Sequence, residues 1–146
     1  MLLPRVMALR YSLNPQISFS AHTFFQKGEQ RKKQMVKGTE KLSKNEQDAL
    51  LELKKHLLDK YNLVEIKLFG SKVRGDADKE SDIDVLIVLK EVNNTIEDEI
   101  FDICFEIDLK YDVVLSAIVY SKAEFNDSLN RVTPFYKSIE KEGVPL

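Results

Sequence analysis

Apolar residues recur at helical spacing after residue 43 of the chain. The spacing of three and four residues predicts an amphipathic helix of about four turns. Ser43 and Glu46 match a capping box at its start. The residues on the apolar side are Leu50, Leu53, Leu57 and Tyr61.

Two apolar stretches of different pattern follow this helix. Residues 63–69 alternate between apolar and polar side chains, which predicts a strand with one exposed face. Residues 85–89 are all apolar and mostly branched, which predicts a central strand covered on both faces. The polar residues 76–81 between them predict a loop.

A long helix and a third strand are predicted next. Asn94 and Thr95 can cap the helix, which reaches about Lys110, and residues 112–119 predict the strand. Several acidic residues in the first helical turns favour the positive end of the helix dipole. The apolar side consists of Ile96, Ile100, Ile103 and Ile107.

The C-terminal end of the chain predicts two short helices. Ser121 and Glu124 match a second capping box, with Phe125 and Leu129 as the expected buried pair. Residues 133–143 predict the last helix, because Pro is favoured at a first helical position and Gly after a last one. The order of elements predicts an α+β (mixed α/β) fold, with one small sheet and helices packed on it.

Composition places the chain among soluble globular proteins of one domain. It has 146 residues, of which 43% are hydrophobic and 32% charged, and no apolar run reaches the length of a transmembrane helix. The single cysteine, Cys104, cannot form an internal disulfide and is expected to be a small buried residue. We therefore expect a cytoplasmic protein that does not span a membrane.

Charge is distributed unevenly along the chain. Residues 1–41 contain eight Lys or Arg and two acids, whereas the rest contains fourteen Lys or Arg and twenty-two acids. Because affinity for nucleic acid comes largely from basic groups that neutralise phosphates, the acidic part is a poor match for a polyanion. Nucleic acid is thus a weaker candidate ligand than a nucleotide bound with metal ions.

Residues 1–34 lack a regular apolar pattern and have three competing interpretations. The preferred one is that Met35 is the true start, so that residues 1–34 are a mis-assigned extension. A disordered arm is the second interpretation. An organellar transit peptide, suggested by Arg and Ser with few acids, is the third. The folded domain is expected over residues 35–146.

Asp82 and Asp84 are the first candidates for catalytic chemistry. Side chains two apart on a strand point the same way, so the two carboxylates should share one space. Two adjacent like charges are costly unless a cation neutralises them, and Mg²⁺ is usually bound through one or two carboxylates. We therefore expect both residues to be metal ligands.

A third carboxylate is needed if the site holds two metal ions. Asp112 is the preferred candidate, because it opens the predicted third strand beside Asp82 and Asp84. Asp108 is the alternative, on the preceding helix. Two ions could then activate an acceptor hydroxyl and stabilise the leaving pyrophosphate.

Gly70 and Ser71 supply the expected phosphate-binding turn. A glycine between a strand and a helix lets the backbone approach a phosphate, and the Ser71 hydroxyl can add a hydrogen bond. Of the neighbouring cations Lys72 and Arg74, Arg74 is preferred, because its guanidinium matches phosphate oxygens in pairs. Gly75 allows the sharp turn after it.

The pattern Gly70-Ser71, ten residues, then Asp82-Ile83-Asp84 resembles the signature of the DNA polymerase beta superfamily, and within it the minimal nucleotidyltransferases. The resemblance implies a nucleotidyltransferase fold with a small mixed sheet flanked by helices. It also implies two Mg²⁺ ions and ATP or another nucleoside triphosphate as donor. Gly70 and Ser71 would bind the triphosphate, and Asp82, Asp84 and Asp112 would ligate metal.

Many minimal nucleotidyltransferases are similar to this chain in size and act as antitoxins. The resemblance implies a partner encoded nearby, a HEPN ribonuclease toxin that is silenced when AMP is transferred to one of its tyrosines. Two alternatives are an inactive antitoxin that works by binding alone and a nucleotidyltransferase acting on a small molecule. The donor base, the acceptor and the number of nucleotides transferred stay open.

The shortness of the chain suggests that a partner presents the acceptor, within a homo- or hetero-oligomer. Five aromatic residues are candidates for that contact, with core packing as the competing role for most of them. They are Phe101, Phe105, Phe125, Phe135 and Tyr136.

Overall fold

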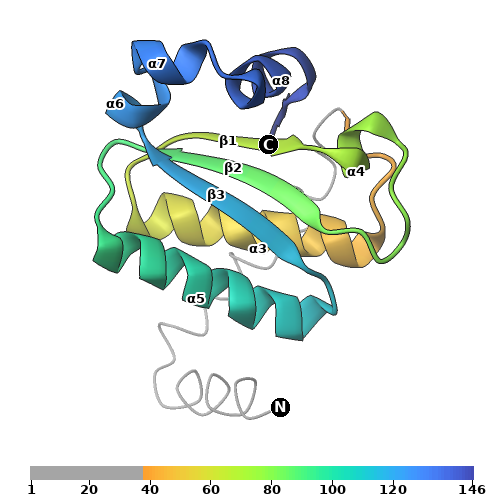
Figure 1. Ribbon diagram of the computed structural model, residues 1–146. Coiled ribbons are helices and arrows are strands. Elements are labelled where there is room, and N and C mark those ends of the chain that lie inside the picture. The colour runs from red at the N-terminus through yellow and green to blue at the C-terminus, as the bar shows by residue number, and fades with distance from the viewer. Residues whose placement is uncertain (1–37) are drawn as a thin grey trace, which may run out of the picture. The chain divides into compact units, whose positions relative to one another are not determined.

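A computed structural model describes residues 38–146, which form a four-stranded sheet with helices on both faces (Figure 1). The predicted α+β class with one small mixed sheet is therefore confirmed. The competing interpretations of residues 1–34 concern residues outside this described part. No helix within residues 38–146 is long and apolar enough to cross a membrane.

The sheet has the strand order β3-β2-β1-β4. β1 is antiparallel to both β2 and β4, whereas β2 and β3 are parallel. β2 is fully flanked and lies inside the sheet, which confirms the predicted central strand. The bounds are Leu63–Phe69 for β1, Ile83–Leu89 for β2, Leu115–Ser121 for β3 and Val144–Pro145 for β4.

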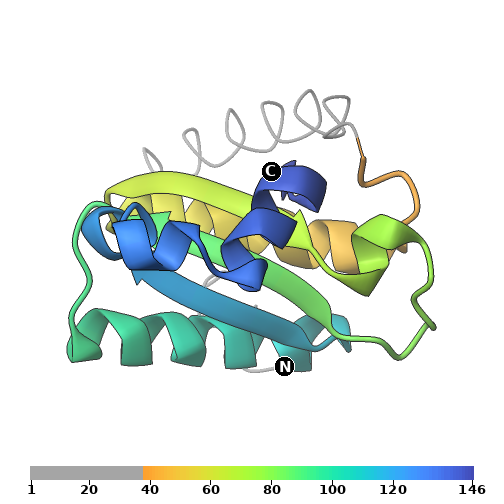
Figure 2. The same ribbon diagram turned by 45° about the horizontal axis from the view of Figure 1, so that its top comes forward.

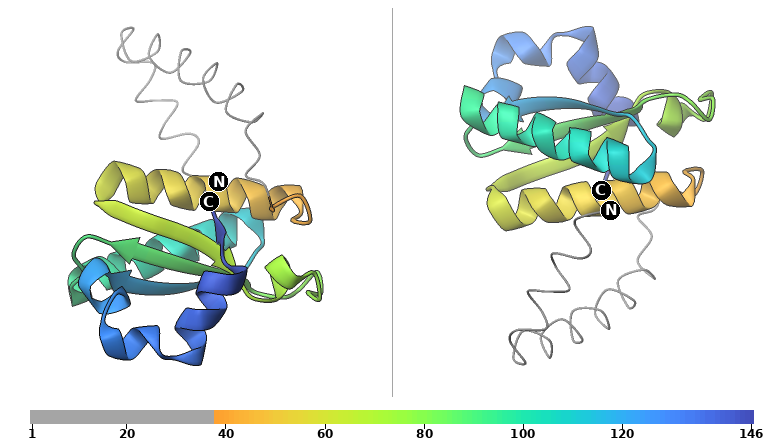
Figure 3. Two further views of the ribbon diagram at one scale, coloured as in Figure 1. Left: turned by 90° about the horizontal axis from the view of Figure 1, so that it is seen from above. Right: turned by 90° about the horizontal axis from the view of Figure 1, so that it is seen from below.

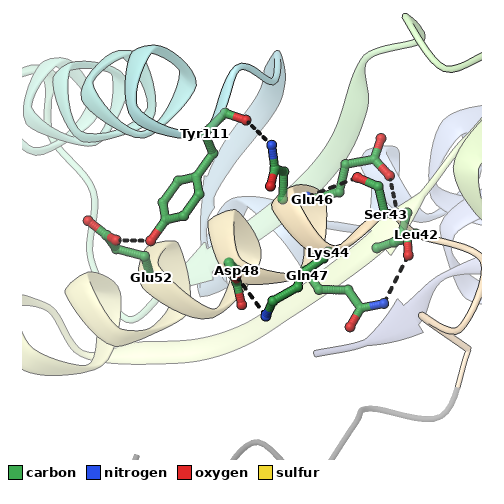
Figure 4. Close-up of polar contacts among 9 residues, drawn as sticks. Leu42, Ser43, Lys44, Glu46, Gln47, Asp48, Glu52 and Tyr111 are labelled. Atoms are coloured by element: carbon green, nitrogen blue, oxygen red, sulfur yellow. Dashed lines mark hydrogen bonds and ion pairs between the residues drawn. The ribbon is translucent and has the colours of Figure 1, made fainter. Parts of the chain in front are cut away.

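The first described helix, α3, spans Lys44–Lys60 and begins at the predicted capping box. The Ser43 side chain accepts a hydrogen bond from the Glu46 backbone N–H, while the Glu46 carboxylate accepts one from the Ser43 N–H (Figure 4). These bonds satisfy two backbone donors that have no partner inside the helix. The predicted apolar residues Leu50, Leu53 and Leu57 are buried.

Helix α5, Asn94–Tyr111, lies beside α3 on the same face of the sheet (Figure 3). It begins one residue earlier than predicted, because the Asn93 side chain accepts the N–H of Ile96 and thereby caps the helix. The Tyr111 hydroxyl donates a hydrogen bond to Glu52 of α3 and ties the two helices together (Figure 4).

The alternating side chains of β2 divide the interior into two cores. Ile83, Val85, Ile87 and Leu89 face α3 and α5, whereas Leu86 and Val88 pack with Phe125 and Ile139 on the other face. Cys104 of α5 belongs to the first core, and burial raises the pKa of its thiol to about 12. The expectation that Cys104 is a small buried residue is confirmed.

Three short helices cover the second face of the sheet (Figure 2). The Ser121–Glu124 capping box and the final helix are confirmed. The predicted burial of Leu129 is wrong: this side chain is 78% exposed, because α6 ends at Phe125 and a new helix starts after Asp127. The helices are α6 Lys122–Phe125, α7 Ser128–Arg131 and α8 Pro134–Glu142.

Candidate active site

The predicted site residues gather where β1 ends and β2 begins. Because these strands are antiparallel, the end of one meets the start of the other, and Phe69 pairs with Asp84. On the other side, Asp84 pairs with Ser116 of β3. Strand alternation puts Asp84 on the face covered by α6, α7 and α8, opposite to α3 and α5.

Gly70 leaves room for the Asp84 carboxylate. Its φ of 76° is a conformation that residues with a Cβ rarely adopt. A Cβ built on Gly70 would lie 2.2 Å from Oδ2 of Asp84, so a side chain here would collide with the carboxylate. The glycine is therefore required both by its backbone angle and by the position of Asp84.

The two carboxylates of the Asp82-Ile83-Asp84 segment interact electrostatically. Burial raises the pKa of Asp84, and the negative charge of Asp82 raises it further. The positive charge of Arg74 and a hydrogen bond donated by the Ser116 hydroxyl act in the opposite direction. Despite them the net shift is upward, so the ionised pair is destabilised without a cation.

The predicted phosphate-binding turn is a short helix, α4, spanning Ser71–Arg74 (Figure 1). The backbone N–H groups of Val73 and Arg74 both donate to the carbonyl of Gly70. Arg74 is half-exposed, with Nε 3.5 Å from Asp76 and a terminal nitrogen 3.5 Å from Glu142. The charge of its guanidinium acts on Asp84, and both of its ion pairs within residues 38–146 are long.

Lys72 has a structural role that the sequence pattern did not reveal. Its side chain is buried and forms an ion pair with the Glu46 carboxylate of α3. The same ammonium group donates a hydrogen bond to the Asp78 carbonyl in the loop before β2, at 3.1 Å. Lys72 therefore joins α3, α4 and the loop, which leaves Arg74 as the cation of the turn with an exposed side chain. No motif predicts such a long-range pair.

Asp112 lies elsewhere than predicted. β3 begins at Leu115, so Asp112 does not open the strand. It is instead the exposed C-cap of α5 in a left-handed conformation, with φ of 54°. Burial raises the pKa of Asp108, the hydrogen bond from the Leu115 N–H lowers it, and the negative charge of Asp82 raises it further. Asp108 also accepts the N–H of Leu115 at 2.8 Å.

The carboxylates of the candidate site suit a Mg²⁺ ion whose remaining ligands come from a substrate. Among residues 38–146, no group of three His, Cys, Asp or Glu side chains is arranged to hold a metal ion. Mg²⁺ is, however, commonly bound by one or two carboxylates, with water and phosphate oxygens as its remaining ligands. Asp82 and Asp84, which repel each other, fit that pattern. Their assignment as metal ligands stays a prediction.

Residues 50–146 match the family described as a nucleotidyltransferase domain. This range contains the strands, α4, α5 and every predicted site residue. The match therefore covers the whole sheet and begins within α3.

Two provisionally named protein adenylyltransferases of Methanocaldococcus jannaschii are similar to this chain. One is 41% identical over 101 residues, which are 68% of this chain and 95% of that protein. The other is 40% identical over 88 residues, 60% of this chain and 82% of that protein.

Two solved structures also resemble the fold, at low identity. A toxin–antitoxin complex with AMP-PNP aligns with a TM-score of 0.48 and 17% identity, covering 67% of this chain and 69% of that one. A provisionally named nucleotidyltransferase from Sulfolobus solfataricus aligns with a TM-score of 0.37 and 24% identity, covering 74% of this chain and 90% of that one.

Proposed function

This chain belongs to the nucleotidyltransferase domain family, and from that premise we propose that it transfers AMP from ATP to a hydroxyl group of a partner protein. The acceptor oxygen would form a bond to the α-phosphorus of ATP. The bond between the α-phosphorus and the oxygen that bridges to the β-phosphorus would break, and pyrophosphate would leave. The observation that carries the proposal is the Asp84 carboxylate seated against Gly70, beside Asp82 and Arg74. The names of both archaeal relatives support protein adenylylation in particular.

Each site residue has a distinct role in this proposal. Gly70 and Ser71 bring backbone and hydroxyl donors to the triphosphate, and Arg74 binds its oxygens through the guanidinium fork. Asp82 and Asp84 would hold Mg²⁺, and a second ion would need a third carboxylate. When bound, Mg²⁺ supplies charge neutralisation for the phosphates and a lower pKa for the acceptor hydroxyl.

The third carboxylate is either Asp112 or Asp108. The sequence favoured Asp112, from the expectation that it opens β3. The proximity of Asp108 to Asp82 now supports Asp108 instead. Because Asp108 also accepts the Leu115 N–H at the start of β3, it would link the position of that strand to the metal site.

We further propose that the acceptor is a tyrosine of a HEPN ribonuclease toxin encoded nearby, with the two proteins forming a hetero-oligomer in the cytoplasm. The sheet and its two helical layers account for nearly all of residues 38–146, so the acceptor would come from another molecule. A protein that brings its own hydroxyl to the edge of the sheet meets this need.

The experiment is incubation of the purified chain with the product of the neighbouring gene, ATP and Mg²⁺, followed by intact mass measurement of both proteins. We expect the partner to gain whole AMP units, and we expect D82N and D84N to slow the transfer on the order of 1,000-fold. D59N, which removes an exposed acid at the end of α3, is the matched control. A partner that is inhibited without gaining mass would indicate neutralisation by binding alone.

A further inference from the structure

Helix α5 carries a row of exposed apolar side chains that we call the α5 row: Phe101, Phe105 and Leu109. They are 43%, 64% and 71% exposed, although such residues are normally buried. Their spacing of four residues places them along one side of the helix. The side of α5 that faces the sheet has its own buried residues, Ile100, Cys104 and Ile107. The α5 row therefore lies outside the buried core of the sheet.

A second row on α5, of acidic residues, runs parallel to the first. Asp98, Asp102 and Glu106 are exposed and each precedes a member of the α5 row by three residues. None of the three forms an ion pair with another described residue. The whole helix contains six acids and one base, Lys110, which is paired with Glu52.

The acidic residues beside the α5 row restrict the kind of molecule that can bind to it. A second copy packed through the same surface would bring two acidic rows together, and like charges in contact disfavour binding. An anionic membrane surface would be repelled for the same reason. A helix with apolar residues on one side and Lys or Arg beside them would bury Phe105 and Leu109 and pair with the acids at once.

We propose that the α5 row is the docking surface for a basic amphipathic helix of a partner protein. The row extends over about 12 Å, so two to three turns of a partner helix would cover it. Ile83 and Val85 belong to the core under α5, and strand alternation points Asp84, which lies between them, to the other face of the sheet. Helices α5 and α8 lie on opposite faces of the sheet (Figures 1 and 3). The α5 row is therefore separated by the sheet from Asp84. A docked partner would leave the carboxylates accessible.

The test uses two labelled synthetic helices of about three turns, one with leucines flanked by lysines and one with the lysines replaced by glutamates. Fluorescence anisotropy with the full chain, without ATP or Mg²⁺, keeps the result independent of the proposed transfer reaction. We expect the lysine peptide to bind at least tenfold more tightly, and F105S to weaken it at least tenfold. L58S, which changes an equally exposed leucine on α3, should leave binding unchanged.

Charge and oligomeric state complete the test. The triple variant D98N/D102N/E106Q should weaken the lysine peptide and remove most of the salt dependence of its binding. Equal binding of both peptides would overturn the proposal. So would a dimer in sedimentation that dissociates in F105S, because a second copy would then be the occupant. Displacement of the lysine peptide by a synthetic peptide of residues 1–37 would also overturn it.

Discussion

Gly70 and Asp84 are fitted to each other so closely that a single methyl group on Gly70 would overlap the carboxylate: the distance from that Cβ to Oδ2 would be 2.2 Å. Gly70 follows the end of β1 and Asp84 lies at the start of β2, and they meet because the two strands are antiparallel. The absence of a side chain at Gly70 therefore allows the position of the Asp84 carboxylate.

Replacement of Gly70 by alanine should reduce transfer on the order of 100-fold, because small misplacements of reacting groups have effects of that size. The measurement is the initial rate of AMP transfer at saturating ATP. G75A is the matched control, since Gly75 also has a positive φ but its Cβ would meet only the flexible end of Lys41. Both variants should lose about 1–2 kcal/mol of stability, and G75A should keep its activity.

The pH dependence of stability should reveal the charge pair. The raised pKa of Asp84 means that the folded chain binds the proton more tightly than the unfolded chain does. The free energy of unfolding without metal should therefore fall as the pH rises from the ordinary aspartate value of 3.8 through the raised pKa. Urea titrations of the chain and of D84N across this range measure it.

In the D84N variant, the free energy of unfolding should no longer fall over this pH range. The variant should also lose most of its transfer activity. A lost Mg²⁺ ligand should cost on the order of 1,000-fold in transfer rate, because metal charge stabilisation amounts to several kcal/mol. Added Mg²⁺ should raise the melting temperature of the unchanged protein and not that of D84N. An equal rise in both would rule out Asp84 as a ligand.

The choice between Asp108 and Asp112 is open to a direct comparison. D108N keeps an oxygen that can accept the Leu115 N–H but removes the charge near Asp82. If Asp108 is the third carboxylate, D108N should raise the Mg²⁺ concentration needed for half-maximal rate about 10-fold or more, and D112N should not. The reverse result would support the original preference for Asp112.

Removal of one partner of the buried ion pair between Lys72 and Glu46 should lower the free energy of unfolding. Burial raises the pKa of Glu46, but the hydrogen bonds from Lys72 and from the Ser43 N–H outweigh it and leave the pKa lowered. K72M should destabilise the fold by about 3–5 kcal/mol in urea unfolding, because it leaves the buried carboxylate without its cationic partner.

The double variant K72M/E46Q is the control for this pair. It should recover much of the stability, since the unpaired charge is gone. It should still weaken transfer, because Lys72 no longer holds the Asp78 carbonyl of the loop. Recovery of both stability and full activity would limit Lys72 to a role in folding.

The sequence predicted those parts of the fold whose causes are local. The capping boxes at Ser43 and Ser121 and the buried run of β2 depend on residues within a few positions of each other. The same holds for the Gly70-Ser71 turn, which local pattern places next to a strand end. These features need no knowledge of the tertiary structure.

The features that were missed depend on distant residues. β4 has two residues and exists only because β1 offers it an edge, so no periodicity could reveal it. The start of β3 was misjudged because Val113 and Val114 continue an apolar run, while α5 ends in a left-handed turn at Asp112. The Lys72–Glu46 pair joins positions that are far apart in the chain.

The antiparallel pairing of β1 and β2 has a consequence for how this site can vary. Gly70 and Asp84 are held by the sheet, so the exposed residues Lys79 and Glu80 between them need not set their distance. Lengthening a flexible loop is thermodynamically mild, since each doubling costs only about 0.6 kcal/mol. The segment is therefore a place where extra residues can be inserted beside the candidate site without a change in the strand pairing that brings Gly70 next to Asp84.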